Sequence, residues 1–546
     1  MASEQRSSNL TTAALYVGVP VLLGASCYYL YYANKNRHSR DGSNSSDQSK
    51  NKSKNKQLTP SEHLAQLKQV GNHNFSRKNY DAAIDSYTRA IDYCKTLAGD
   101  CIKPNDLAVF YQNRAACNEA LGDLEKVISD CDRAIELNEN YVKAYVRRAK
   151  AYEKLGKYDK AMVDAYSANL LDKFQNQSNM ILAENIVKAS SKMKAANAMK
   201  NHKFSWPANQ TIKSYFTAFT HDPIKEKLGN TINVTPEQLQ TLLDEANKPE
   251  NENNAFSMLV RGSCLSLMGD MKSAQETFDQ LLALSDEQCP PRYKSNALIK
   301  KAAVVISEPP IDGSTTSIYG DLEAVNELLE QAIKIDPENP DIYLHKSQAL
   351  ALSDKLVEAI EALNKAIALK EDFQSAIAQR FYIEFKLQTS DPLASLDKLS
   401  GLLDQFKEAV KANPNSADLH QMYAQVLSEL NYFEQADQVL LDMSKIDPTD
   451  ANVYVTRALL QFHMKNDPDD IANMMQQALK IDPKILFAYE ILGSIETQRG
   501  KLDEAIRLFE TALQYARNEG EFTRCYSLLD SAISQKAAAE LIGTQA

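Results

Sequence analysis

The feature that most constrains the fold of this chain is a repeat. A small residue is followed twelve positions later by alanine, and an aromatic residue stands four positions beyond that alanine, in three sets: Gly71, Ala83 and Tyr87; Gly262, Ala274 and Phe278; Gly493, Ala505 and Phe509. Alanines also recur 34 residues apart, at Ala134 and Ala168, Ala332 and Ala366, and Ala478 and Ala512. A fixed period of this length indicates an array of identical supersecondary units.

A 34-residue period with small residues at fixed positions is the signature of the tetratricopeptide repeat, a helix-turn-helix unit. Glycine and proline are scarce, with 17 and 18 residues, which also favours helices. We therefore predict an all-α fold in which repeats stack into a superhelix. Three units are expected over 61–173 and six to eight over 251–535. Residues 174–250 lose the period, and the helix at "YSLLDSAISQKAAAELI" is expected to cap the last repeat.

The amino-terminal end predicts a membrane anchor. No charged residue occurs between Arg6 and Lys35. Residues 11–33 are long enough, as a helix, to cross a hydrocarbon core of about 30 Å. Residues 34–57 carry seven basic and two acidic residues and no aliphatic or aromatic side chain, which predicts a disordered tether. The basic flank favours residues 1–10 outside the cytosol and the bulk of the chain inside it. A cleaved secretory signal is the alternative.

Composition excludes several functions. The formal net charge of -11 disfavours nucleic acid as a partner, because binding to phosphates needs a broad basic surface. The eight cysteines form no C-x-x-C pair, and the eight histidines show no i, i+4 pairing, so neither a metal site nor a cofactor is predicted. Without a phosphate-binding loop or a nucleophile motif, we predict a binding protein and no enzyme.

One repeat face concentrates charge against this acidic background. The first helices of repeats line the inner wall, mainly through positions 2, 5, 6 and 9. Those positions of the first three units hold three cations and two amides: Lys68, Asn72, Asn113, Lys143 and Arg147. Converging cations favour a ligand with clustered carboxylates, such as a peptide carboxyl terminus next to an acidic side chain. Arg148 and Lys150 lie off this face and are expected to face solvent.

These five residues resemble the two-carboxylate clamp of chaperone-binding tetratricopeptide domains. That resemblance implies binding of the Glu-Glu-Val-Asp carboxyl termini of Hsp70 and Hsp90. Stretches such as "FYQNRAA", "VKAYVRRAKAYEKL", "IKSYFTAFT" and "YEILGSIETQRG" also resemble the 70 kDa class of import receptors of the mitochondrial outer-membrane translocase, in its animal form. The similarity runs over almost the whole length, whereas the anchor and tether resemble the family only in kind.

The resemblance implies a division of labour among six segments. Residues 1–10, 11–33 and 34–57 would anchor the chain in the mitochondrial outer membrane. Residues 58–173 would dock the chaperone, 174–250 would form a helical bridge, and 251–546 would receive a hydrophobic precursor, such as a metabolite carrier, for transfer to other translocase subunits. Mixed polar and apolar residues on the late inner wall could line that groove, or could pack the superhelix: Gln421, Gln425, Tyr454, Phe487, Glu490 and Ser494. The alternative function is a membrane-anchored co-chaperone without a precursor groove.

Overall fold

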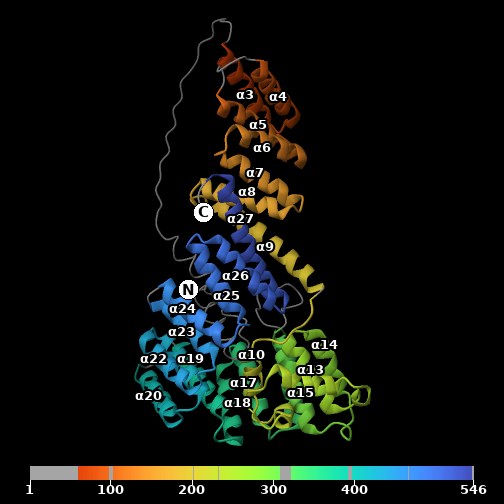
Figure 1. Cartoon of the computed structure of the whole chain (residues 1–546), viewed down its shortest axis with the longest axis vertical. Coiled ribbons are helices and arrows are strands. Elements are labelled where there is room, and N and C mark those ends of the chain that lie inside the picture. The colour runs from red at the N-terminus through yellow and green to blue at the C-terminus, as the bar shows by residue number, and fades with distance from the viewer. Residues whose placement is uncertain are drawn as a thin grey trace. The chain divides into compact units, whose positions relative to one another are not determined.

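The computed structural model describes residues 59–96, 103–200, 202–231, 233–307, 321–390, 396–464 and 467–543, and these residues form helices and connecting turns without a β-strand (Figure 1). The predicted anchor, tether and amino-terminal segment lie outside the described residues. None of the described helices is long and apolar enough to cross a bilayer. The all-helical prediction is confirmed.

The described residues divide into two compact units, and the division falls within helix α25 (Leu486–Gln498). We call residues 202–492 the central unit, and residues 59–200 together with 493–543 the N-terminal unit. The helices of the N-terminal unit, besides the end of α25, are α3 (Pro60–Ser76), α4 (Tyr80–Thr96), α5 (Pro104–Leu121), α6 (Leu124–Leu137), α7 (Val142–Lys154), α8 (Tyr158–Leu171), α9 (Gln177–Lys200), α26 (Leu502–Tyr515) and α27 (Glu519–Leu541).

The central unit begins with short helices and continues as paired ones. Its helices are α10 (Asn209–Thr217), α11 (Pro223–Lys227), α12 (Pro236–Ala246), a 3₁₀ turn (Pro249–Asn251), α13 (Ala255–Met268), α14 (Met271–Leu282), α15 (Pro291–Ser307), α16 (Leu322–Ile335), α17 (Pro340–Leu352), α18 (Leu356–Leu369), α19 (Gln374–Ser390), α20 (Leu396–Ala412), α21 (Ala417–Glu429), α22 (Phe433–Ile446), α23 (Ala451–Met464) and α24 (Pro468–Ile481). Helices α13 to α26 make seven consecutive pairs, within the expected range of six to eight.

Local sequence explains where several helices begin. Thr59 caps α3 through a capping box with Glu62, and Pro60 occupies the first turn, where its missing N–H costs nothing. Asp222, Asp270 and Asp321 cap α11, α14 and α16 in the same way, with side-chain oxygens accepting from backbone N–H groups of the first turn. These caps satisfy donors that a helix leaves without partners at its start.

The repeat glycines are required by close helix crossings. A Cβ atom added at Gly262 would lie 2.5 Å from the ring of Phe278, and the same holds at Gly71, 2.5 Å from Tyr87, and at Gly493, 2.4 Å from Phe509. Each aromatic side chain is almost completely buried against the paired helix. The small residues therefore let an aromatic ring of one helix rest on the backbone of the other.

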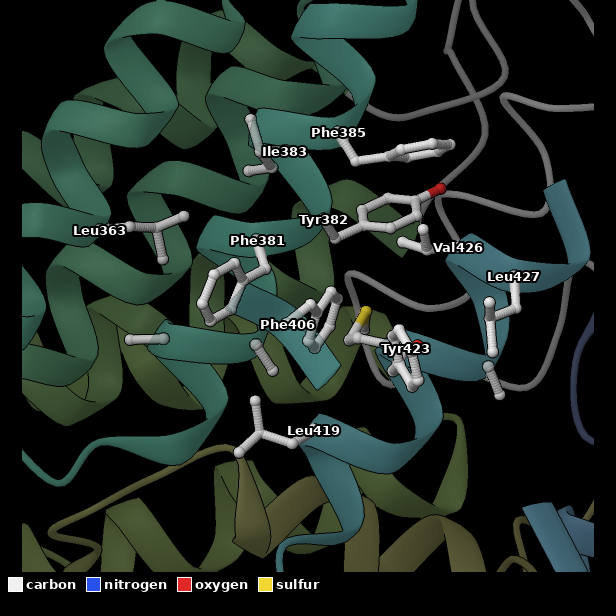
Figure 2. Packing of buried hydrophobic residues seen from close by; sticks show 14 of the residues in the cluster. Leu363, Phe381, Tyr382, Ile383, Phe385, Phe406, Leu419, Tyr423, Val426 and Leu427 are labelled. Atoms are coloured by element: carbon white, nitrogen blue, oxygen red, sulfur yellow. The ribbon is translucent and has the colours of Figure 1, made fainter. Parts of the chain in front are cut away.

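The core of the central unit is aromatic where α19, α20 and α21 meet. Phe406 packs against Phe381 with ring centroids 4.8 Å apart and against Tyr423 at 5.2 Å, so one ring of α20 lies between the two other helices (Figure 2). Leu363 and Leu419 extend the same cluster. Such ring pairs add stability beyond the apolar area that they bury.

Residues 206–228 are bound to the central repeats by buried polar contacts. Lys300 of α15 is fully buried, with Nζ 2.7 Å from Asp222 Oδ2 and 3.1 Å from Ser263 Oγ. Rings of this segment lie 5.2 to 5.5 Å from the same ammonium: Tyr215, Phe216 and Phe219. Burial lowers the pKa of Lys300, and the charge of Asp222 opposes that shift. The ammonium thus fixes the segment in the array through paired charge and cation–π contacts.

The last helix does more than cap a repeat. Helix α27 packs against α8 and α9 as well as α26 (Figure 1). Buried Asp530 accepts hydrogen bonds from Lys194 Nζ at 2.8 Å and from Ser190 Oγ at 3.0 Å, both on α9. Helix α27 therefore belongs to the same compact unit as the first three repeats.

We predict that Gly262→Ala lowers the thermal unfolding midpoint of the chain. The new methyl group overlaps the fully buried ring of Phe278, and overpacking of this kind costs about 1–3 kcal/mol. Gly401→Ala in α20 is the matched control, because nothing lies within 4 Å of its added Cβ. That change should stabilise the chain by about 0.5–1 kcal/mol. Equal midpoints for the two variants in calorimetry would contradict the crossing argument.

Candidate functional site

Helix α7 presents three of its cations along one stripe. Lys143, Arg147 and Lys150 follow one another at i, i+4 and i+7, and all three line one cavity of about 190 Å³. The other lining residues come from α5, α7, the turn before α9 and the first turn of α9: Gln112, Glu119, Val142, Val146, Asn176 and Asn179. The cavity is therefore a cationic pocket built by three helices of the N-terminal unit.

Arg147 is held in place by two contacts from α5. Its Nε donates to Glu119 Oε2 at 2.7 Å, and its Nη1 donates to the backbone carbonyl of Gln112 at 3.3 Å. Both charged side chains are mostly buried, with 21% and 29% of their surface exposed. The guanidinium keeps further N–H donors, because only part of its fork is used. Arg147 is thus pre-oriented in the cavity wall, and its remaining N–H groups can still donate to a ligand carboxylate.

The remaining predicted residues lie outside the cavity lining. Asn72 accepts a hydrogen bond from Tyr87 Oη at 2.7 Å, which fixes its amide and leaves the amide nitrogen as a donor. Burial raises the pKa of Tyr87 to about 12, so this hydroxyl stays a donor at neutral pH. Lys68 is exposed and Asn113 is half-buried. Within the described ranges, the side chains of Lys68, Asn113 and Lys143 make no hydrogen bond or ion pair, so their polar groups are open to a ligand.

The expectation that Arg148 faces solvent was wrong, whereas Lys150 is exposed as expected. Lys150 lines the cavity with Lys143 and Arg147, as the i, i+4, i+7 spacing could have indicated. Arg148 is mostly buried: it pairs with Asp164 through Nε at 2.8 Å and Nη2 at 2.6 Å, and with Asp132 through Nη1 at 2.6 Å. Burial raises the pKa of Asp164, and the guanidinium of Arg148 opposes that shift. Arg148 therefore connects α7 to α8 and α6.

Sequence reasoning missed two groups in the cavity. Glu119 provides the carboxylate that orients Arg147. Gln112 is 4% exposed, and its Oε1 is buried without a hydrogen-bond partner among the residues that the structure describes. A buried acceptor without a donor is costly, so this oxygen is a place where a ligand N–H would be stabilised. Gln112 directly precedes Asn113 and so stands at position 5 of the second unit, one of the inner-wall positions, whereas Glu119 lies outside those positions.

The residues predicted to line a groove in the late repeats do not share one cavity lining in the way that Lys143 and Arg147 do. Gln425 donates to Glu429 at 2.9 Å, and Glu429 also accepts from Tyr382 Oη and Lys386 Nζ, both at 2.7 Å. Gln421, Tyr454 and Phe487 are half-buried.

Two further groove candidates differ from these. Glu490 is 4% exposed, so little of it can meet a ligand, and Ser494 falls in the N-terminal unit. Nothing in the geometry collects the six residues into one site.

Comparison with known proteins agrees with the repeat assignment. Profiles of the tetratricopeptide repeat match residues 131–162 and 319–379. The chain is 32% identical to a human protein named mitochondrial import receptor subunit TOM70, over 97% of this chain and 92% of that protein. The chain belongs to the TOM70 family of mitochondrial import receptors. The resemblance stated from the sequence is thereby confirmed over nearly the full length.

Two solved structures are also similar. The crystal structure of yeast Tom70 is 23% identical and covers 88% of this chain and 97% of the yeast chain, with a TM-score of 0.48. The first TPR domain of Spaghetti (RPAP3), bound to the HSP90 peptide SRMEEVD, is 30% identical and covers 24% of this chain and 94% of that domain, with a TM-score of 0.21.

We predict that Arg148→Ala destabilises the N-terminal unit, because it leaves Asp164 buried without its partner. Breaking a buried ion pair from one side costs about 3–5 kcal/mol. The matched control is Lys154→Ala, on the exposed end of the same helix, which should change the unfolding midpoint little. The double variant Arg148→Met, Asp164→Leu should recover most of the loss, since both charges are removed. An unaltered midpoint for Arg148→Ala would mean that this pair is not structural.

Proposed function

We propose that this chain is a receptor that docks cytosolic Hsp70 and Hsp90 by their acidic carboxyl termini and receives the precursors that they carry. The observation that carries the proposal is the cavity in which Lys143 and a pre-oriented Arg147 stand with open donors. Charge-assisted hydrogen bonds from such donors suit carboxylates. Lys68, Asn72 and Asn113 complete the clamp and bind the peptide beyond the cavity.

Family membership supports the wider role that we propose. The chain is anchored by residues 11–33 in the mitochondrial outer membrane, with the repeats in the cytosol, and it passes precursors to other translocase subunits. The precursor segment binds on the central repeats near Gln421, Gln425, Tyr454 and Phe487. The receptor acts by binding and catalyses no reaction. A co-chaperone without a precursor surface is the alternative.

The clamp predicts that Arg147→Ala weakens binding of the peptide SRMEEVD more than tenfold. Loss of a charge-assisted hydrogen bond costs about 1.5–3 kcal/mol, which corresponds to that factor. Arg133→Ala is the matched control, because Arg133 is exposed on α6, outside the cavity lining, and pairs with Glu136 of the same helix. Calorimetry on the whole chain measures both. Unchanged affinity in Arg147→Ala, with the unfolding midpoint preserved, would remove the clamp assignment.

The precursor surface is best tested in the whole chain, because residues after 492 pack with the N-terminal unit and a fragment starting at residue 251 would lose that support. A photo-crosslinker at Tyr454 should capture a hydrophobic carrier precursor on isolated mitochondria. The same crosslinker at exposed Lys272 on α14 is the control. Capture from neither position would favour the co-chaperone. Equal capture from both positions would mean that precursor contact is not confined to a surface at Tyr454. Absence of the chain from the mitochondrial fraction would contradict the proposed localisation in the mitochondrial outer membrane.

A further inference from the structure

The segment that leads into the central repeats bonds at one end to repeats far along the chain. The backbone N–H of Gln210, in the first turn of α10, donates to Asp482 Oδ2 at 3.3 Å, and Lys213 Nζ pairs with Asp447. Asp447 directly follows α22 and Asp482 directly follows α24, so both carboxylates stand in turns between helices. We call residues 206–213 the latch segment, because its partners lie 234 and 272 positions later in the chain.

The other end of the same segment is held by buried groups. The carboxylate of Asp341, in the first turn of α17, accepts from the backbone N–H groups of Thr220 at 2.9 Å and His221 at 3.2 Å. Asp341 has no exposed surface, and neither Asp222 nor its partner Lys300 has any. Breaking a buried ion pair from one side costs far more than breaking an exposed one, so this end stays attached.

The contacts of the latch segment are the weaker ones. The side chains of Lys213 and Asp447 keep 18% and 26% of their surface exposed. The hydrogen bond from Lys484 Nζ to the backbone carbonyl of Trp206 is long, at 3.3 Å, and exposed. Local opening of a protein begins where contacts are few and solvated. The segment therefore opens first at residues 206–213.

The latch contacts lie next to the surface proposed for a precursor. Tyr454 stands in the first turn of α23 (Ala451–Met464), and Phe487 stands in the first turn of α25. Asp447 and Asp482 occupy the turns directly before these two helices. Each pair is thus separated by about one helical turn, which rises about 5.4 Å. A ligand at Tyr454 and Phe487 and the closed latch segment would compete for the same two turns.

We propose that the latch segment is an autoinhibitory contact, which obstructs the precursor surface while bound to Asp447 and Asp482 and opens before a precursor binds. This inference rests on the proposed function of the central repeats. Opening turns the segment about its fixed attachment at residues 220–222. Ile212 is completely buried, so the closed form is favoured and the open form is a minor population. A ligand that meets only the open fraction has its apparent affinity reduced by that fraction.

Hydrogen exchange on the full chain in detergent measures the opening. Lys213→Gln removes the ion pair with Asp447 and should accelerate deuterium uptake by residues 206–213 about fivefold. Uptake by residues 219–224 and the unfolding midpoint should stay unchanged, because the buried end is intact. Lys227→Gln is the matched control, since Lys227 is exposed at the end of α11 in the same part of the chain, and it should alter neither measurement.

Photo-crosslinking on isolated mitochondria measures the consequence for binding. With the crosslinker at Tyr454 and a carrier precursor at limiting concentration, Lys213→Gln should raise capture by the same factor as it raises exchange. Lys227→Gln should leave capture unchanged. Unaltered exchange of residues 206–213, or faster exchange without higher capture, would overturn the latch and leave the precursor surface in place. Capture at Tyr454 by neither the unaltered chain nor Lys213→Gln would overturn the precursor surface and the latch together.

Discussion

The close crossing of two helices in each repeat is the constraint on which the rest of the structure depends. At Gly71, Gly262 and Gly493 an aromatic ring of the paired helix lies directly on the glycine backbone. A Cβ atom at any of these positions would overlap that ring. Each crossing sets the angle of a helix pair, and stacking of pairs sets which face of the first helix remains free.

Position along α7 determines whether a cation lines the cavity or joins two helices. Arg147 and Arg148 are adjacent in sequence, but their side chains diverge around the helix. Arg147 meets Glu119 in the wall of a cavity, whereas Arg148 meets Asp164 and Asp132 between helices. Arg147 keeps N–H groups that can bind a ligand in place of water. Arg148 directs its N–H groups to Asp164 and Asp132 within the fold. The nearby carboxylates, more than the arginines themselves, decide which cation is available.

The sequence predicts the fold well, because the 34-residue period reports helix pairing directly. It groups Lys143 and Arg147 by position in the repeat, and both line the cavity, yet it expects Arg148 to face solvent and gives no sign of Glu119 as part of the cavity. The contacts of Arg148 and Glu119 join different helices, and no period encodes them. The packing of α27 on α9 through Asp530 is likewise a pairing of segments 340 residues apart.

Charge is divided along the chain in the way that a basic clamp requires. Residues 202–492 contain 26 lysines and arginines and 43 aspartates and glutamates, whereas the N-terminal unit, residues 59–200 with 493–543, contains 27 and 26. The acidic total therefore arises from the central unit, and the unit that carries the cavity is close to neutral. An acidic peptide terminus would be repelled by the central repeats more than by the first ones. The acidic charge of the central unit disfavours binding of acidic peptide termini there. A ligand of the central unit would therefore differ in chemistry from a ligand of the first repeats.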